Sequence, residues 1–321
     1  MPTLADVVAA RARLEGIALR TPLEPSPELA DVAGAAEVRL KREELQPTGA
    51  FKTRGAHNKV AIVAEGRPEA ALVTASSGNH GIAVATAAMR HDMRLTVLVG
   101  RSVSPAKLER LRALETGRIT IELAGDDSDA AEIEARRRDD AGHAIYVPPY
   151  NDPDVIAGQA TVGVEITEDW PEVDAIVVPI GGGGLIAGIG LWAKAVKPGL
   201  RLIGVQPSAS PPMYAHFETG TTDPMPIAPT LADGVAGNIE SSSITWKLCR
   251  DLVDEVVLVD EEQIRDAMRW AIEVPHSVLE GSAVLGIAAL QAGLIDATER
   301  RVAVVTTGRN VALDTVRSVI G

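Results

Sequence analysis

Between residues 71 and 145, short apolar segments alternate with segments that have a helical pattern. The apolar segments cover 71–75, 95–99, 119–123 and 145–147, and the helical segments cover 81–89, 104–114 and 128–141. Short apolar strands separated by amphipathic helices are typical of βαβ units, whose strands are parallel and whose helices cover the sheet. The sequence therefore predicts an α/β protein with mostly parallel sheets and helices on both faces.

The same alternation returns after residue 146. Strands are expected over 175–180, 202–206, 255–259 and 301–306, with helices within 150–170 and over 185–196, 261–274 and 282–292. The segment 208–229 is rich in proline, serine and threonine and is predicted to be loop and turn. We expect a large domain from residues 1–70 and 146–321, a small domain from 71–145, and a ligand site in the cleft between them.

Composition limits the functions that are open to this chain. Its 321 residues are enough for two lobes, and a net charge of −13 argues against binding nucleic acid or an anionic membrane surface. Cys249 is the single cysteine, so no disulfide can form within the chain and a reducing compartment is indicated. No basic segment followed by an apolar run opens the sequence, and no apolar stretch is long enough for a membrane span. We expect a cytoplasmic protein.

Lys52 is the first candidate catalytic residue. It follows Pro47 and Gly49, which interrupt regular structure, and it is expected to begin a helix over 52–65. A helix N-terminus disfavours a cation, so a lysine there suits a neutral amine or an imine. The chain has seven lysines and twenty-four arginines, and arginine cannot form a Schiff base. The alternative is an ordinary solvated lysine.

Four consecutive glycines, Gly181 to Gly184, lie between an expected strand and an expected helix. Their backbone amides can approach an anion closely, so they are predicted to bind the phosphate of a small cofactor. The residues from Gly182 to Ala187 also fit the dinucleotide pattern G-x-G-x-x-A, but the next strand ends at Gln206, without the acidic residue that such a site uses. A purely structural turn is the third possibility.

A second polar loop, Ser76 to His80, lies between the strand at 71–75 and the helix expected to begin at Gly81. Its hydroxyls and backbone amides suit a carboxylate. A helix-capping hydrogen bond is the alternative for Ser77.

Three segments in this order, TGAFKTRGA around Lys52, SSGNHG at 76–81 and GGGGL at 181–185, resemble the signature set of the fold-type II pyridoxal-phosphate enzymes. Within that group they resemble the serine/threonine dehydratase and serine racemase branch. The resemblance extends from residue 20 to residue 310 and implies a two-lobed architecture like that of the tryptophan synthase β subunit.

The resemblance also implies roles for individual residues. Lys52 would hold pyridoxal 5'-phosphate as a Schiff base, and Ser77 matches the residue that serves racemases as a base on the opposite face. Phe51 would pack beside the cofactor ring, and an ordinary core position is the alternative. The other cofactor contacts would be Asn79 at the 3-oxygen, Thr307 at the ring nitrogen, and Gly181, Gly182, Gly183, Gly184 and Leu185 at the phosphate. The substrate carboxylate would be held by Ser76, Ser77, Gly78, Asn79 and His80. Residues 280–283 resemble an acidic segment near the cofactor, with no role assigned.

The reaction implied is β-elimination from threonine or serine, which gives a 2-oxo acid and ammonia. Alternatives are an amino-acid racemase, a dehydratase for another 3-hydroxy amino acid such as hydroxyaspartate or phenylserine, a nicotinamide-dependent oxidoreductase and a non-catalytic binding protein. A homodimer is expected from the resemblance. Racemase-like members hold a divalent cation with a glutamate where this chain has Gln206, so we expect no metal there.

Overall fold

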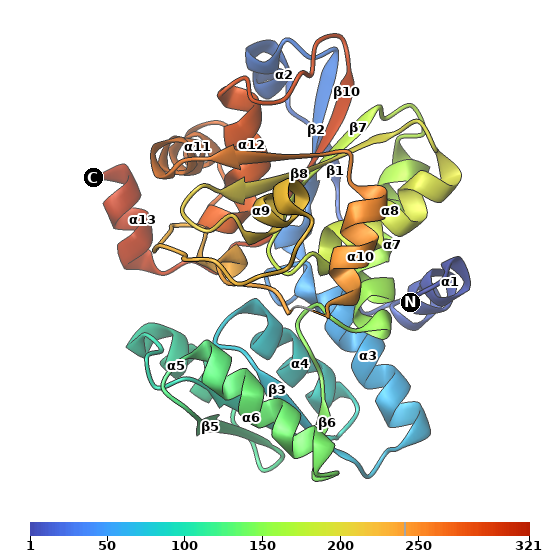
Figure 1. Cartoon of the computed structure of the whole chain (residues 1–321), viewed down its shortest axis with the longest axis vertical. Coiled ribbons are helices and arrows are strands. Elements are labelled where there is room, and N and C mark those ends of the chain that lie inside the picture. Colours follow the sequence, from blue (N-terminus) through green and yellow to red (C-terminus); the bar gives the residue numbers. More distant parts are fainter. Residues whose placement is uncertain (241) are drawn as a thin grey trace.

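The computed structural model describes residues 1–240 and 242–321 and has two lobes, each built on one sheet (Figure 1). The larger sheet has the strand order β1-β2-β10-β7-β8-β9. Only its edge pair β1–β2 is antiparallel, and the other neighbours are parallel. The strands are β1 (Leu23–Pro25), β2 (Glu37–Arg42), β7 (Ala175–Pro179), β8 (Arg201–Pro207), β9 (Glu255–Val259) and β10 (Arg301–Thr306). The predicted α/β class is confirmed.

The smaller sheet is wholly parallel, in the order β5-β4-β3-β6. Its strands are β3 (Ala71–Ala75), β4 (Arg94–Val99), β5 (Ile119–Leu123) and β6 (Ile145–Tyr146). All four lie within the segment in which the sequence placed the small domain. The domain boundaries themselves remain a prediction.

Helices surround both sheets, and none in the described part of the chain is long and apolar enough to cross a lipid bilayer (Figure 1). The α-helices are α1 (Leu4–Arg13), α2 (Pro27–Ala33), α3 (Lys52–Gly66), α4 (Asn79–Arg90), α5 (Pro105–Arg112), α6 (Ser128–Asp140), α7 (Pro153–Asp169), α8 (Gly184–Val196), α9 (Pro212–Thr219), α10 (Ile244–Leu252), α11 (Glu261–Glu273), α12 (Leu285–Gln291) and α13 (Leu313–Ile320). The described residues also form the short 3₁₀ helices η1 (Glu43–Leu45), η2 (Asp233–Val235) and η3 (Gly281–Val284).

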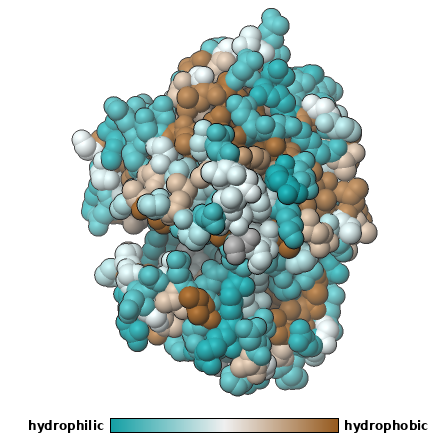
Figure 2. Space-filling model, viewed as in Figure 1, coloured by the Kyte–Doolittle hydropathy of each residue, from teal (hydrophilic) through white to brown (hydrophobic). Residues whose placement is uncertain are grey.

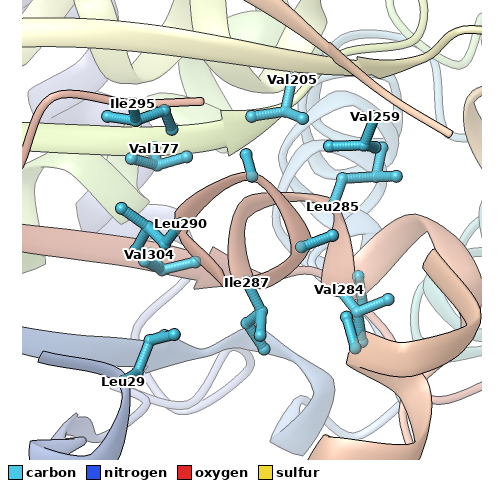
Figure 3. Close-up of a cluster of buried hydrophobic side chains, with 14 of the residues drawn as sticks. Leu29, Val177, Val205, Val259, Val284, Leu285, Ile287, Leu290, Ile295 and Val304 are labelled. Carbon is cyan, nitrogen blue, oxygen red and sulfur yellow. The ribbon is translucent and has the colours of Figure 1, made fainter. Parts of the chain in front are cut away.

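The central strands of the large sheet, β7, β8 and β10, are buried on both faces, which explains why they are almost continuously apolar. Val177 of β7 packs with α11 and α12 on one face, whereas its neighbours Ile176 and Val178 pack with α7 and α8 on the other. Figure 3 shows α12 side chains, including Leu285 and Leu290, among the valines of the strands. The two packed faces hold the strand ends, and therefore the loops that follow them, in fixed positions.

Helix α3 connects the two lobes. Near its start, Gly55 meets Gly158 of α7 so closely that a Cβ on Gly158 would lie 2.7 Å from the Cα of Gly55. Further along, Val60 and Val63 join the apolar core of the small lobe. The helix that begins at Lys52 is therefore packed into both lobes.

Two local predictions were wrong. The segment 208–229 was predicted as loop, but it contains α9, whose Met213 and His216 are buried and whose His216 ring lies 5.8 Å from that of Trp246. Tertiary packing stabilises this two-turn helix, which has little helical propensity of its own. Helix α4 begins at Asn79, so the last two residues of the predicted loop 76–80 form its first turn.

Candidate active site

A cleft of about 650 Å³ lies between the lobes, and every residue predicted to bind the cofactor or the substrate lines it. In Figure 2 the surface is hollowed between the two lobes. The cleft lies at the carboxyl ends of β3 and β6, where the strand order of the small sheet reverses, and at those of β7 and β10 in the large sheet. Ligands of open α/β sheets bind at such reversal points. The lining includes Phe51, Lys52, Ser76, Ser77, Gly78, Asn79, His80, Gly181, Gly182, Gly183, Gly184, Leu185 and Thr307.

Lys52 is the first residue of α3, as predicted. The turn before it is fixed to the segment that follows β10, since the Phe51 amide donates to the Thr307 carbonyl (3.1 Å) and the Arg309 amide donates to the Gly49 carbonyl (3.0 Å). The Lys52 ammonium donates to the carbonyl oxygen of Pro149 at 2.7 Å. It lies 5.1 Å from the centre of the Phe51 ring. Lysine, ring and strand end are thus held together.

The surroundings of Lys52 increase the neutral fraction of its amine. Burial lowers the pKa of Lys52 to about 8, and the negative charge of Glu280 acts in the opposite direction. The position at a helix N-terminus also disfavours the cation. An amine with this pKa has an appreciable neutral, nucleophilic fraction near neutral pH.

The four glycines form a cradle at the N-terminus of α8. Gly183 has φ +83°, a conformation that glycine adopts without strain, and a Cβ on Gly182 would lie 2.4 Å from the Tyr150 ring. Within the described residues, the amides of Gly182 to Gly184 donate no hydrogen bond to protein. Unpaired amides at a helix N-terminus form an anion site.

A second helix N-terminus, that of α4, faces the cleft from the small lobe. Its N-cap is Gly78, which provides no capping side chain, and the Gly78 amide donates to the Ser76 hydroxyl at 3.2 Å. His80 points away from this loop, because its Nε2 donates to the Val147 carbonyl at 2.9 Å. Burial, with the nearby charge of Lys52, lowers the pKa of His80 to about 3, so the ring is neutral. His80 can therefore contribute to anion binding only through its backbone.

The other predicted contacts belong to both the cleft and the core. Phe51 lines the cleft and also packs against the apolar cluster around α8, so both interpretations of its ring hold. Thr307 is 3% exposed, and among the described residues its hydroxyl has no hydrogen-bond partner. Leu185, which follows the glycine loop in the chain, also lines the cleft. The individual roles of these residues remain predictions.

Sequence reasoning missed several residues of the cleft. Residues 233–238 line it and were not expected there. Glu280 and Ser282 also line it, in agreement with the resemblance that placed residues 280–283 near the cofactor without assigning a role. The glycines Gly234 and Gly237 were the available signal for a close approach of the backbone in segment 233–238.

Gln206 lies where racemase-like members have a metal-binding glutamate. Its buried side-chain amide donates to the Ile180 carbonyl (3.2 Å) and accepts from the Tyr214 backbone amide (2.8 Å), so both of its polar atoms form hydrogen bonds within the fold.

Comparisons with known proteins agree with this geometry. A family described as "Pyridoxal-phosphate dependent enzyme" matches residues 14–308. The chain belongs to this family. It is 39% identical to the L-threonine ammonia-lyase of Thermotoga maritima, covering 100% of this chain and 78% of that protein. The catabolic L-threonine dehydratase TdcB of Escherichia coli is 35% identical, with 98% of this chain and 95% of that protein covered. The structure of maize serine racemase superposes with a TM-score of 0.91 at 30% identity, covering 99% and 97% of the two chains.

The predicted cofactor, fold and family are thereby confirmed. The site of this pyridoxal-phosphate-dependent enzyme fits its cofactor, since it has an amine of lowered pKa for the aldehyde and a cradle of free amides for the phosphate. A Cβ at Gly182 would meet the ring of Tyr150, which also lines the cleft, so only glycine fits at this point of the cradle.

The lowered pKa of Lys52 predicts how cofactor uptake depends on pH. Below the pKa each unit of pH changes the neutral fraction about tenfold, so the rate of uptake should rise with pH and level off above about 8. Stopped-flow absorbance of apoprotein mixed with pyridoxal phosphate measures this rate. Nα-acetyl-lysine, which keeps a free ε-amine, is the control, and its rate of reaction with pyridoxal phosphate should level off at a much higher pH. The same pH profile for the protein and for Nα-acetyl-lysine would contradict a lowered pKa of Lys52.

Replacing Gly182 with alanine should weaken cofactor binding. The added Cβ would lie 2.4 Å from the Tyr150 ring, and overpacking of this kind costs about 1–3 kcal/mol, or roughly a 5- to 150-fold loss of affinity. Gly66→Ala is the matched control, because a Cβ there meets nothing within 4 Å. Equal cofactor affinities for the two variants, measured by fluorescence titration, would contradict the cradle.

Proposed function

We propose that this enzyme eliminates the β-hydroxyl group from threonine or serine and releases a 2-oxo acid and ammonia. The observation that carries the proposal is the convergence, in one cleft, of the Lys52 amine, the free amides of the glycine loop and the N-terminus of α4. Similarity to an L-threonine ammonia-lyase over the whole of this chain and 78% of that protein supports the choice of reaction.

Each element would have a distinct task. The amides of Gly182 to Gly184 would hold the cofactor's phosphate, and Thr307 would meet its ring nitrogen. When bound, the cofactor withdraws electrons from the substrate's α-carbon. The neutral Lys52 amine, with its pKa near 8, would accept the α-proton. The amides at the start of α4 would hold the substrate carboxylate. Loss of the α-proton and of the β-hydroxyl, as water, leaves an enamine that hydrolyses to the 2-oxo acid and ammonia.

The charge of the cleft favours a substrate with a neutral side chain. Its described lining contains no arginine, and the lysine other than Lys52, Lys107, is already paired with Asp233 at 2.6 Å. The acidic residues of the lining are Asp127, Asp129, Glu132, Asp233 and Glu280. A second substrate carboxylate would face like charges, which cost several kcal/mol. We therefore expect kcat/KM for 3-hydroxyaspartate to be at least about 100-fold below that for threonine or serine.

A racemase is the second candidate, because Ser77 lines the same cleft as Lys52 and maize serine racemase has a similar structure. Incubation with L-threonine and L-serine, with detection of both 2-oxo acid and the opposite α-epimer, separates the two reactions. A 2-oxo acid with little epimer supports the lyase. Rapid epimer formation that Ser77→Ala abolishes would replace it with the racemase.

The assembly and the compartment are also proposals. The single cysteine, Cys249, is buried, which suits a reducing compartment such as the cytoplasm. A homodimer is proposed from the family resemblance, and sedimentation velocity would test it.

A further inference from the structure

The side-chain amide of Asn79 is held from both ends by the large lobe. Its Nδ2 donates to the carboxylate of Glu280, at 2.8 Å to Oε1 and 3.1 Å to Oε2. Its Oδ1 accepts from Nδ2 of Asn310 at 2.5 Å. Asn79 begins α4 of the small lobe, so these contacts cross the cleft that the residue lines.

The hydrogen bonds around Asn79 allow one orientation of its amide. Nδ2 of Asn310 also donates to the carbonyl of Thr48 at 2.9 Å, and a carbonyl can only accept. The atom of Asn79 that faces Asn310 must then be the oxygen. At the other end, the Glu280 carboxylate accepts from Nδ2 and from the backbone amide of Asn310 at 3.1 Å. A flipped Asn79 would set oxygen against oxygen and nitrogen against nitrogen.

Glu280 is buried beside Asn79. It is 8% exposed, and Gly308 lies so close that a Cβ on Gly308 would meet Glu280 Oε1 at 2.6 Å. Burial raises the pKa of Glu280 to about 7, against the opposing hydrogen bond from Asn79. A carboxyl group kept in such surroundings needs its hydrogen-bond donors, which here are the two asparagines.

We infer that Glu280 is a positioning residue that, with Asn310, fixes Asn79 so that its amide presents an N–H rather than its carbonyl oxygen to the cofactor. The inference rests on the proposed function. One hydrogen of the Asn79 amide, shared between the two oxygens of the Glu280 carboxylate, accounts for both contacts, and the second hydrogen is then left for a ligand in the cleft. An N–H stabilises an anionic oxygen of the cofactor ring, whereas a carbonyl oxygen would repel it.

A double-mutant cycle tests whether Glu280 acts through Asn79. The cofactor affinity of the apoprotein is measured by fluorescence titration for the wild type, Asn79→Ala, Glu280→Ala and the double variant. Each single variant should bind pyridoxal phosphate about tenfold more weakly, the loss expected for one hydrogen bond to a charged group. The double variant should bind no more weakly than Asn79→Ala. Glu122→Gln is the control, because Glu122 pairs with Arg138 on the small lobe, outside the lining of the cleft, and should bind like the wild type.

A conservative variant separates positioning from mere structural support. Glu280→Ala should shift the visible absorption band of the bound cofactor. Glu280→Gln keeps the size of the side chain and one acceptor oxygen, so it should bind the cofactor more tightly than Glu280→Ala and return the band to its wild-type position. Thermal unfolding of each apoprotein identifies folded variants. If Glu280→Ala does not fold, the cycle is run with Glu280→Gln.

The outcomes are distinguishable. Additive losses in a wild type that binds cofactor, or a folded Glu280→Ala with unchanged affinity, would overturn the inference and leave the proposed function standing. A wild type that takes up no pyridoxal phosphate would overturn both.

Discussion

Replacing Lys52 with alanine is expected to lower the rate of elimination by at least about a thousandfold, because the amine is both the cofactor's anchor and the proposed proton acceptor. The fold should survive, since the described hydrogen bond of the Lys52 side chain is a single one to the Pro149 carbonyl. Formation of 2-oxo acid from L-threonine, followed with a coupled assay, measures the loss.

Lys197→Ala is the matched control for Lys52→Ala. Lys197 also donates to backbone carbonyls, those of Pro171 at 3.0 Å and Val173 at 2.6 Å, but it lies outside the cleft. Its replacement should leave the rate near that of the wild type. A Lys52→Ala protein that kept a tenth of wild-type activity would contradict the assigned role.

Replacing Arg54 with alanine should strongly lower the free energy of unfolding. Its guanidinium binds Glu43 through two bonds (2.7 and 2.8 Å) and Glu165 through two more (2.6 and 2.8 Å). The Arg54 and Glu43 side chains are 2% and 0% exposed. Removing one partner of a buried pair leaves an uncompensated charge, so we expect the free energy of unfolding to fall by about 3–5 kcal/mol. Urea denaturation followed by circular dichroism measures it.

Arg137→Ala provides the comparison for Arg54→Ala. Arg137 also pairs through two bonds, with Glu134 at 2.6 and 2.9 Å, but its side chain is 63% exposed. Water solvates both charges when such a pair is broken, and the free energy of unfolding should hardly change. Similar urea midpoints for the two variants would show that the Arg54 network does not support the fold. Since Arg54 lies two residues after Lys52, its loss should also disturb the start of α3.

The local sequence pattern predicted most of the fold. The parallel strands at 71–75, 95–99 and 119–123 follow from short apolar runs between amphipathic helices. The runs at 71–75 and 95–99 are the more conspicuous, because those two strands are largely buried. Helix α9 could not be predicted, because it depends on contacts with Trp246, far away in the sequence. Helix α2 was also missed, since its seven residues are too few to show a clear period.

The parts of the candidate site that could be predicted are those with a local sequence pattern. The strand–glycine–helix pattern placed Gly181 to Gly184 at an anion site, and the helix start drew attention to Lys52. The partners of Asn79 were not predictable, because Glu280 and Asn310 lie more than 200 residues away and meet it only across the cleft. The ion cluster of Arg54 had a weaker signal, since Lys41 to Glu44 place four charges at the end of a strand with apolar neighbours.

Borohydride reduction of the wild-type protein in the presence of pyridoxal phosphate, followed by peptide mapping, tests whether Lys52 holds the cofactor. We expect a visible absorption band that disappears on reduction and a stable cofactor adduct on the peptide that contains Lys52. Absence of the band after cofactor is added, or an adduct on any of the other six lysines instead, would contradict it.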